Sequence, residues 1–169
     1  MSVDRRLPAG EMIVDRAPAR LTIHGLGSCV ALFIHDLTAG IGGLAHVLLP
    51  GPPGAGGAAV PADAAIPGLG RYAGTAVAAM VAESIRLGAR AANLRARLAG
   101  GARMFACDVG TDRETVGDRN VAAILHALGA AGVAVAAIDV GGHRGRTVTA
   151  DLAEGSLTIR MLGGITRTI

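Results

Sequence analysis

The chain has 169 residues, a typical length for one domain with its own hydrophobic core. Its net charge is only +3, and its 16 basic residues, all of them arginine, are scattered among 13 acidic ones. Aromatic residues make up 2% of the chain, so the sequence lacks both the basic stripe and the stacking surfaces of a nucleic-acid-binding protein. We therefore expect no nucleic-acid partner.

The sequence has no segment that we expect to enter a membrane. The first six residues lead into no apolar run of the kind that a signal peptide contains. Residues 120–138 carry no charge and approach the ~20-residue length of a span, but Gly129 and Gly132 favour a helix end followed by a strand. Cys29 and Cys107 form no CxxC pair, which is typical of reduced thiols in the cytosol. We therefore predict a cytoplasmic protein without membrane insertion.

Hydrophobic patterning predicts, in chain order, two short strands, a hairpin, a helix, a strand, a second helix, a strand and a final hairpin. Eight strands with two long helices indicate an α/β domain built on a largely antiparallel or mixed sheet. The strands are expected at residues 11–15, 20–24, 29–35, 41–49, 94–99, 133–140, 147–151 and 156–161, and the helices at 71–87 and 117–128.

The remaining segments are expected to be loops or tails. Residues 51–70 are rich in glycine, alanine and proline, which is typical of a mobile surface loop. We place the domain at residues 11–163, between a flexible N-terminal tail at 1–10 and a C-terminal tail at 164–169. Cys107 lies in a polar loop predicted at 106–115, and we interpret it as structural or incidental.

Cys29 is a candidate nucleophile because of the turn that precedes it. The turn, Gly25-Leu26-Gly27-Ser28, comes directly before an apolar run that predicts a buried strand. Glycine in such a turn permits sharp backbone conformations and close approach of a substrate. A thiol at this place is exposed, and the backbone amides around Gly27 and Ser28 are free to hold an oxyanion, as acyl transfer requires.

His46 is the candidate base, because the hairpin register places it near Cys29. If residues 36–39 form the turn of a simple antiparallel hairpin, Ile34 faces Ile41 and Cys29 faces His46. Directly opposed residues have Cβ atoms roughly 4.5–5.5 Å apart. A histidine at that distance lowers the pKa of the thiol and activates the nucleophile. The inference depends on the turn, since a register slip would break the alignment.

Other interpretations of these residues stay open from spacing alone. A lone cysteine in an apolar strand is usually a core residue, and a lone histidine there is usually structural. A metal site made of His24, Cys29 and His46 would lack a fourth ligand and the spacing typical of zinc. The G-x-G before Cys29 resembles the start of a dinucleotide fingerprint, but a valine stands where the third glycine belongs. Residues 139–146 are expected to form a turn at the rim, where Arg146 is either a substrate contact or simply solvated. We predict neither a metal nor a cofactor.

Several segments, in the same order along the chain, resemble motifs of the CheD family. The offset of seventeen residues from Cys29 to His46 also matches that family. The resemblance covers roughly residues 11–163. The matching segments are Gly25-Leu26-Gly27-Ser28-Cys29-Val30, residues 42–50 (GGLAHVLLP), Arg71-Tyr72, residues 100–105 (GGARMF), residues 116–120 (VGDRN), and residues 139–142 (DVGG) with Gly145-Arg146.

The resemblance implies both a fold and an activity. CheD proteins are three-layer α/β sandwiches that deamidate glutamine side chains of bacterial methyl-accepting chemoreceptors to glutamate and ammonia. Some also hydrolyse receptor methyl esters, and many bind the phosphatase CheC. Carried over to this chain, Cys29 is the nucleophile that forms a thioester and His46 is the general base, with chemoreceptors as substrates and a CheC-like phosphatase as a further partner.

The chain departs from the family at one catalytic position. The family has a threonine six residues before the cysteine that orients the histidine, and here that position is Ile23. Thr22 is adjacent, but neighbouring strand residues face opposite sides, so it would orient His46 only if a bulge turned it inward. A backbone carbonyl is the other candidate for this role. The departure favours one alternative, a weakly catalytic or non-catalytic adaptor that binds receptors or a CheC-like phosphatase. A third interpretation, a cysteine hydrolase of small amides, stays open independently of this position.

Overall fold

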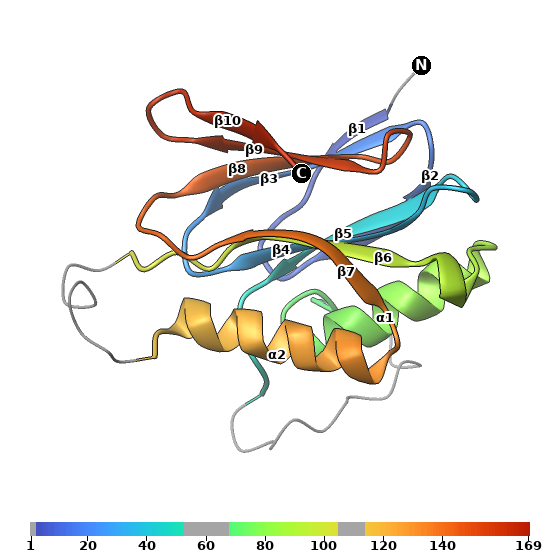
Figure 1. Cartoon of the computed structure of the whole chain (residues 1–169), viewed down its shortest axis with the longest axis horizontal. Coiled ribbons are helices and arrows are strands. Elements are labelled where there is room, and N and C mark those ends of the chain that lie inside the picture. The colour runs from blue at the N-terminus through green and yellow to red at the C-terminus, as the bar shows by residue number, and fades with distance from the viewer. Residues whose placement is uncertain (1–2, 53–67, 105–113) are drawn as a thin grey trace.

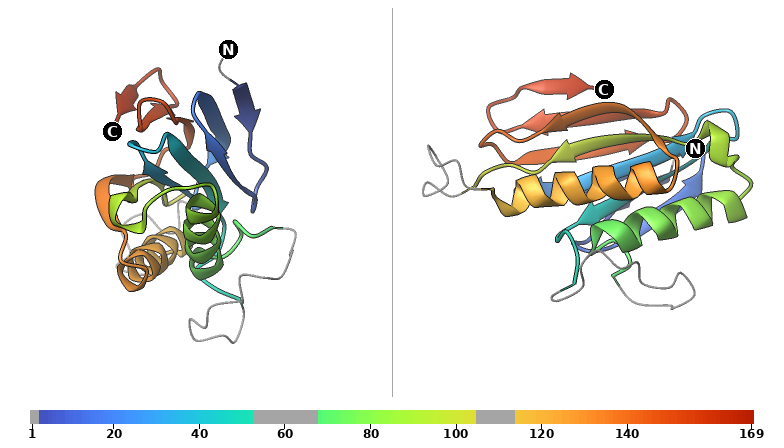
Figure 2. Two further views of the ribbon diagram at one scale, coloured as in Figure 1. Left: turned by 90° about the vertical axis from the view of Figure 1, so that its right-hand side faces the viewer. Right: turned by 60° about the horizontal axis from the view of Figure 1, so that its bottom comes forward.

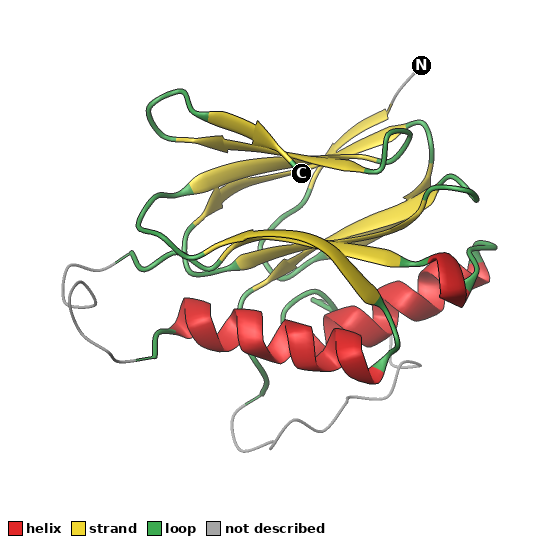
Figure 3. Ribbon diagram, viewed as in Figure 1, coloured by secondary structure: helices red, strands yellow, loops and turns green. Residues whose placement is uncertain are grey.

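The computed structural model describes residues 3–52, 68–104 and 114–169. They form three layers, with two β-sheets stacked face to face and two helices on the outer face of one sheet (Figures 1 and 3). This confirms the predicted α/β sandwich. The expected sheet is divided into two sheets of five strands each. The division follows from burial, because the central strands of the covered sheet, at residues 30–36 and 41–47, are buried along their whole length and need a second layer on the other side.

Sheet A contains the strands from both ends of the chain. β1 pairs in parallel with β3, and the other neighbours are antiparallel. The strand order is β1-β3-β8-β9-β10. The strands span Val3–Arg6 (β1), Ala19–Leu26 (β3), Arg146–Asp151 (β8), Ser156–Met161 (β9) and Thr166–Thr168 (β10).

Two of these strands lie in segments that we expected to be flexible tails. β1 falls within residues 1–10 and β10 within 164–169, so the prediction of tails is wrong for these residues. Leu7, directly after β1, is buried, and its amide donates to the carbonyl of Thr22 at 2.9 Å. The sequence of each strand is polar (VDRR and TRT), so no apolar pattern marks it. Backbone hydrogen bonds to β3 and β9 place these strands instead.

Sheet B lies between sheet A and the helices. Its order is β2-β5-β4-β6-β7, and only the β6–β7 pair is parallel. All eight predicted strands of the two sheets are present, with ends within two residues of the expected ones. The strands of sheet B span Met12–Arg16 (β2), Ile41–Val47 (β5), Val30–Asp36 (β4), Arg95–Gly100 (β6) and Ala134–Val140 (β7).

Both predicted helices pack side by side on sheet B (Figure 2). α1 spans Ala73–Arg86, and its buried residues recur every three or four positions, so that one apolar face meets the sheet. α2 spans Val116–Ala130 and begins with a capping box between Thr115 and Asp118. A short 3-10 helix at Ala91–Asn93 was not predicted. Neither long helix has the length and hydrophobicity that a membrane span would need, within the part of the chain that the structure describes.

Strand β4 separates the two halves of the core. Val30, Leu32 and Ile34 face the helices, whereas Ala31 and Phe33 face sheet A, and all are fully buried. Burial on both faces explains why the run is apolar throughout rather than alternating. Cys29 directly precedes β4, so this rigid strand anchors the residue.

Helix α2 begins in direct backbone contact with the end of β6. A Cβ atom at Gly117 would lie 2.5 Å from the carbonyl oxygen of Gly101. That is too close for any side chain, so glycine is required for this approach. Gly100, which adopts a φ of +119°, makes a similar approach to the carbonyl of Cys29. The start of α2, the end of β6 and Cys29 are therefore packed backbone against backbone.

This contact predicts opposite effects for two glycines of the same helix. Gly117→Ala should lower the free energy of unfolding by about 1–3 kcal/mol, the usual cost of overpacking. Gly129→Ala is the matched control, because a Cβ atom there meets nothing within 4 Å, and alanine should leave the stability unchanged or raise it by up to ~1 kcal/mol. Urea unfolding followed by circular dichroism measures both. Equal stabilities of the two variants would contradict the contact.

Candidate active site

Cys29 and His46 lie on the same face of sheet B, but they are not directly opposed. In the β4–β5 hairpin Asp36 pairs with Ile41, and His46 is opposite Ala31. The predicted register is therefore wrong by two residues. The loop between the paired residues is longer than expected, because the Asp36 carboxylate accepts from the amide of Ala39 at 3.1 Å and Gly40 adopts a φ of +62°.

This register shift has a small effect, because it amounts to an even number of residues. Side chains alternate along a strand, so a shift by two positions keeps Cys29 on the face that carries Ala31. Cys29 thus becomes a diagonal neighbour of His46, for which Cα atoms are about 7–8 Å apart in a regular ladder. A slip by one residue would have placed the two side chains on opposite faces.

Both side chains line one cavity of about 500 Å³ at the end of the sandwich. Cys29 is half-buried and carries a free thiol, and His46 is 6% exposed. The cavity therefore joins the candidate nucleophile and base to the segment after β1, which we had expected to be part of a tail. Its other walls are formed by Arg6, Leu7, Pro8, Ala9, His24, Gly25 and Leu48.

The turn before β4 is held at three consecutive carbonyl groups. The amides of the two residues after Gly100 donate to the carbonyl oxygens of Cys29 and Gly27, at 2.8 and 2.9 Å respectively. The side-chain amide of Asn120 donates to the carbonyl of Ser28 at 3.1 Å. Within the described ranges, the amides of Ser28 and Cys29 donate to no backbone acceptor. With the amide of Gly27, which also donates to no backbone acceptor among the described residues, they remain available for a substrate oxygen.

Asn120 connects this turn to the strand that carries His46. The side chain is fully buried, and its Nδ2 donates to Ser28 at 3.1 Å and to the carbonyl of Leu48 at 2.9 Å. The side-chain amide of Asn120 thus fixes the distance between Ser28, which precedes Cys29, and Leu48, which lies two positions after His46. We predicted no role for Asn120 from the sequence. The available signal was its place in the VGDRN segment, as a polar residue at a helix position whose neighbours at the same spacing are apolar.

Thr22 does not face the cavity. Ile23 is buried between the sheets, whereas the hydroxyl of Thr22 is 2.9 Å from that of Thr149 on the outer face of sheet A. The irregularity in β3 lies between Ile23 and Leu26, after Thr22, so it does not turn Thr22 inward. Strand alternation therefore excludes Thr22 as the residue that orients His46, and that expectation is wrong.

The backbone around Pro8 lies against His46 instead. The amide of Gly10 donates to the carbonyl of His46 at 3.1 Å, and the amide of His46 donates to the carbonyl of Glu11 at 2.9 Å. The Pro8 carbonyl also acts on the imidazole, since its hydrogen bond raises the pKa of His46. Nδ1 of His46 is buried and has no hydrogen-bond partner among the described residues, so the ring is oriented by no side chain there.

Burial favours the uncharged forms of both groups. Desolvation raises the pKa of the Cys29 thiol, opposed in part by the backbone amide of the same residue. Desolvation also lowers the pKa of His46, opposed in part by Pro8. The expectation that His46 lowers the pKa of the thiol is therefore wrong for the free protein. Near pH 7 the site holds a neutral thiol beside a neutral imidazole.

The segments that resemble CheD motifs meet around the Cys29 turn. The amide of Gly141 donates to the carbonyl of Gly100 at 2.9 Å, and the amide of Arg103 donates to that of Gly142 at 2.8 Å. The Arg103 side chain pairs with Asp118 at 3.2 Å. The end of β6, the start of α2 and the turn after β7, which are far apart in sequence, therefore form one support for the nucleophile.

Arg146 belongs to a buried ion pair. It lies 3.1 Å from Asp139, and both side chains are 5% exposed. Asp139 also pairs with Arg167 at 2.9 Å. Neither expectation for Arg146, a substrate contact or a solvated side chain, holds, because its guanidinium group is bound to Asp139 and to the carbonyl of Gly141. The network ties β7 of sheet B to β8 and β10 of sheet A.

Two other interpretations from the sequence are limited by what the structure describes. His24, Cys29 and His46 share the cavity, yet no three His, Cys, Asp or Glu side chains in residues 3–52, 68–104 and 114–169 are grouped so that they could hold a metal ion. Cys107, most of the loop expected at 106–115, and residues 53–67 of the loop expected at 51–70 lie outside the described residues.

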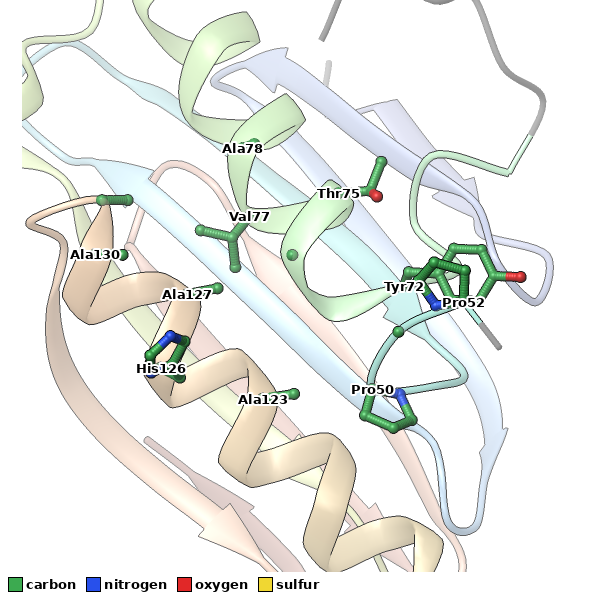
Figure 4. Close-up of a pocket in the computed structure, with 13 residues that line it drawn as sticks. Pro50, Pro52, Tyr72, Thr75, Val77, Ala78, Ala123, His126, Ala127 and Ala130 are labelled. Atoms are coloured by element: carbon green, nitrogen blue, oxygen red, sulfur yellow. The ribbon is translucent and has the colours of Figure 1, made fainter. Parts of the chain in front are cut away.

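A second cavity, of about 400 Å³, lies between α1 and α2 (Figure 4). Alanine is the commonest residue in its walls, with Pro50, Tyr72 and Val77 on one side and His126 on the other. None of the predicted site residues lines it. It therefore has no part in the chemistry inferred for Cys29.

Comparison with known proteins identifies the family. A family model described as CheD chemotactic sensory transduction matches residues 55–161. The chain is 38% identical over 152 residues to a protein of Desulfitobacterium hafniense named probable chemoreceptor glutamine deamidase CheD, and the match covers 90% of this chain and 89% of that protein. The chain belongs to the CheD family. The resemblance seen in the sequence motifs is thereby confirmed.

Two further similarities complete the comparison. The chain is 37% identical over 155 residues to the chemoreceptor glutamine deamidase CheD of Thermotoga maritima. This match covers 92% of this chain and 90% of that protein. It is also similar to the crystal structure of Bacillus licheniformis hypothetical protein YfiH, with a TM-score of 0.43 and 18% identity over 77% of this chain and 49% of that one. The second similarity is too weak to support any argument about this CheD chain.

The two hydrogen bonds of Asn120 predict a large loss of stability on substitution. Asn120→Ala leaves two buried carbonyl groups unsatisfied and should cost about 2–5 kcal/mol, and Asn120→Asp should cost at least as much, because it places a carboxyl group against two carbonyl oxygens. Urea unfolding measures both. His126→Ala, at an exposed position of the same helix, is the control and should lie within about 0.5 kcal/mol of the wild type. Wild-type stability in both Asn120 variants would exclude the connecting role.

The neutral pair predicts how Cys29 reacts with iodoacetamide. Because the thiol pKa is raised by burial, the alkylation rate should keep rising above about pH 8.5, the ordinary pKa of a thiol. His46→Ala should move the midpoint of that profile by less than about half a unit, since the imidazole is not charged in this range. Peptide mapping by mass spectrometry separates Cys29 from Cys107. A wild-type rate that is already maximal below pH 7, and that becomes pH-dependent in His46→Ala, would indicate an ion pair instead.

Proposed function

We propose that this chain is a cysteine-dependent protein-glutamine deamidase that converts glutamine side chains of bacterial chemoreceptors to glutamate and ammonia. The observation that carries the proposal is that Cys29 and His46 open into one cavity, beside backbone amides that donate to no backbone acceptor in residues 3–52, 68–104 and 114–169. Relatives that match along nine-tenths of the chain are named chemoreceptor glutamine deamidases. The protein would act in chemotaxis, in the cytoplasm, where the signalling ends of chemoreceptors lie.

In the first half-reaction, His46 accepts the proton of the Cys29 thiol as sulfur attacks the side-chain carbonyl of glutamine. The oxygen of the tetrahedral intermediate becomes an anion, which the backbone amides around Gly27, Ser28 and Cys29 stabilise. The imidazolium then donates its proton to the departing nitrogen. Ammonia leaves, and a thioester joins Cys29 to the substrate.

In the second half-reaction, neutral His46 takes a proton from water, which attacks the thioester. Collapse of the second tetrahedral intermediate releases the glutamate side chain and returns the proton to the sulfur. This scheme starts from the neutral pair that burial favours, because proton transfer and attack occur together. The Pro8 carbonyl supports it, because its effect on the pKa of His46 favours the imidazolium of the intermediate.

A non-catalytic adaptor is the second candidate function, and Ile23 is the observation that favours it. At this position the family has a threonine, and here an apolar side chain is buried between the sheets. An adaptor would bind receptors, or a CheC-like phosphatase, with little turnover. We favour the enzyme, because the Pro8 carbonyl can perform the orienting role that the threonine would otherwise have.

Mass spectrometry of a chemoreceptor cytoplasmic fragment tests the proposal. Wild-type protein should convert specific glutamines to glutamates, each detected as an amide-to-acid mass change. Cys29→Ala should abolish conversion, and His46→Ala should slow it by about 10²–10⁴-fold, because the general base is lost. His126→Ala is the matched histidine control and should convert the fragment at the wild-type rate. Full activity of Cys29→Ala would sink the scheme.

The remaining outcomes separate the alternatives. If folded wild type binds the fragment without converting it, the adaptor is supported, and Ile23→Thr should then be tested for gained activity. If free glutamine and small amides are hydrolysed while receptor glutamines are not, the protein is a small-amide hydrolase. In every catalytic case His46 must be neutral, and burial lowers its pKa, so the rate should persist at the ordinary histidine pKa of about 6.5 and fall only at lower pH.

A further inference from the structure

The outer face of sheet A is open, whereas the outer face of sheet B is covered by the helices (Figures 1 and 2). This outer face is hollowed by a depression of about 400 Å³. Cationic and hydroxyl side chains from four strands dominate its lining. The lining residues are Asp4, Arg5, Arg6, Arg20, Thr22, His24, Thr147, Thr149 and Arg160.

The strand register arranges these side chains in rows across the sheet. In the row farther from Cys29, Asp4 is opposite Arg20, which is opposite Asp151. Arg20 and Asp151 form an ion pair at 2.8 Å. This row therefore carries its own counter-charges. Arg5, on the edge strand, is likewise paired with Asp15 at 3.3 Å.

The rows nearer Cys29 lack such counter-charges. Arg6 is opposite Thr22, and Arg160 is opposite Thr147. Neither arginine makes an ion pair with any residue that the structure describes. Uncompensated positive charge thus gathers at the end of the sheet where β3 leads into the turn before Cys29. We call Arg6, His24 and Arg160, with the three threonines of the depression, the outer basic surface.

The outer basic surface is continuous with the active-site cavity. Arg6 and His24 line both the depression and the cavity that holds Cys29 and His46. Arg160 also lines a third hollow, together with Gly25 of the nucleophile turn. A protein segment whose glutamine enters the cavity must therefore place its flanking residues beside Arg6 and Arg160.

We propose that the outer basic surface binds acidic side chains that flank the target glutamine, so that this enzyme selects glutamines in acidic protein segments. Arginine guanidinium groups bind carboxylates through paired hydrogen bonds, and the threonine hydroxyls supply further donors. Uncompensated charge beside a cavity also steers oppositely charged segments toward it. The inference rests on the proposed function for the identity of the target residue, but its binding term can be measured without turnover.

Binding is measured with Cys29→Ala protein and fluorescein-labelled peptides that carry one glutamine. The peptides differ only in the residues two to four positions from that glutamine, which are glutamate, alanine or lysine. At low ionic strength the glutamate-flanked peptide should bind more tightly than the alanine-flanked one by about three- to tenfold, with the lysine-flanked peptide weakest, and the preference should shrink in about 0.5 M salt.

Substitution of Arg160 locates the preference, because this residue lies outside the cavity with Cys29. Arg160→Gln should reduce the preference for glutamate by about three- to fivefold, and Arg160→Lys should restore most of it, since charge rather than shape carries the effect. Arg86→Gln removes the same charge on the helical layer, where Arg86 pairs with Glu83, and should leave the preference unchanged.

Two results would overturn the inference. One is equal binding of the three peptides, and the other is an equal effect of Arg160→Gln and Arg86→Gln, which would reduce the surface to net charge. Conversion of the same peptides by wild-type protein is followed separately by mass spectrometry. If the protein prefers the glutamate-flanked peptide but converts none, the deamidase is refuted and the role of the outer basic surface stands. If it converts the peptides without any preference, the deamidase stands and the role of the surface is refuted.

Discussion

The rest of the site depends on one constraint, the close backbone contact between α2, the end of β6 and the turn that leads into Cys29. Gly117 lets the helix rest on the carbonyl of Gly101, and Gly100 lets β6 approach the carbonyl of Cys29. Only at this separation can Asn120 reach from the helix to both the turn and the end of β5. The helical layer thereby sets the spacing between the turn before Cys29 and the strand that carries His46.

Burial is the second determinant, and it acts on charge rather than on geometry. Burial in the cavity raises the pKa of the Cys29 thiol and lowers the pKa of the His46 imidazole. Both side chains are therefore neutral in the free protein. A resting thiolate is more reactive toward any electrophile, whereas a neutral thiol reacts only where a base and an oxyanion site act together. Such a pair would suit the proposed deamidase, which must select one amide among the many on a protein surface. Pro8 contributes the polar contact that keeps the imidazole from being wholly desolvated.

The sequence was most informative where periodicity carries the signal. Alternation in β3 was enough to argue that Thr22 and Ile23 face opposite sides, and the structure places them so. The hairpin register was predicted two residues away from the true one, because turn length is set by local hydrogen bonds of Asp36 and by the backbone of Gly40. The even size of the error preserved the face, which is why Cys29 and His46 were still brought together.

The sequence by itself determined the two helices, eight of the strands, the shared face of Cys29 and His46, and the family. These features follow from apolar periods, from glycine turns and from ordered motifs, all of which are local in the chain. Only the tertiary structure decided that polar β1 and β10 join sheet A, that Pro8 reaches His46, and that Asn120 connects two strands. These contacts join residues that are distant in sequence, and polar or backbone groups make them. Such groups impose no period on the sequence, so the packed layers alone specify their partners.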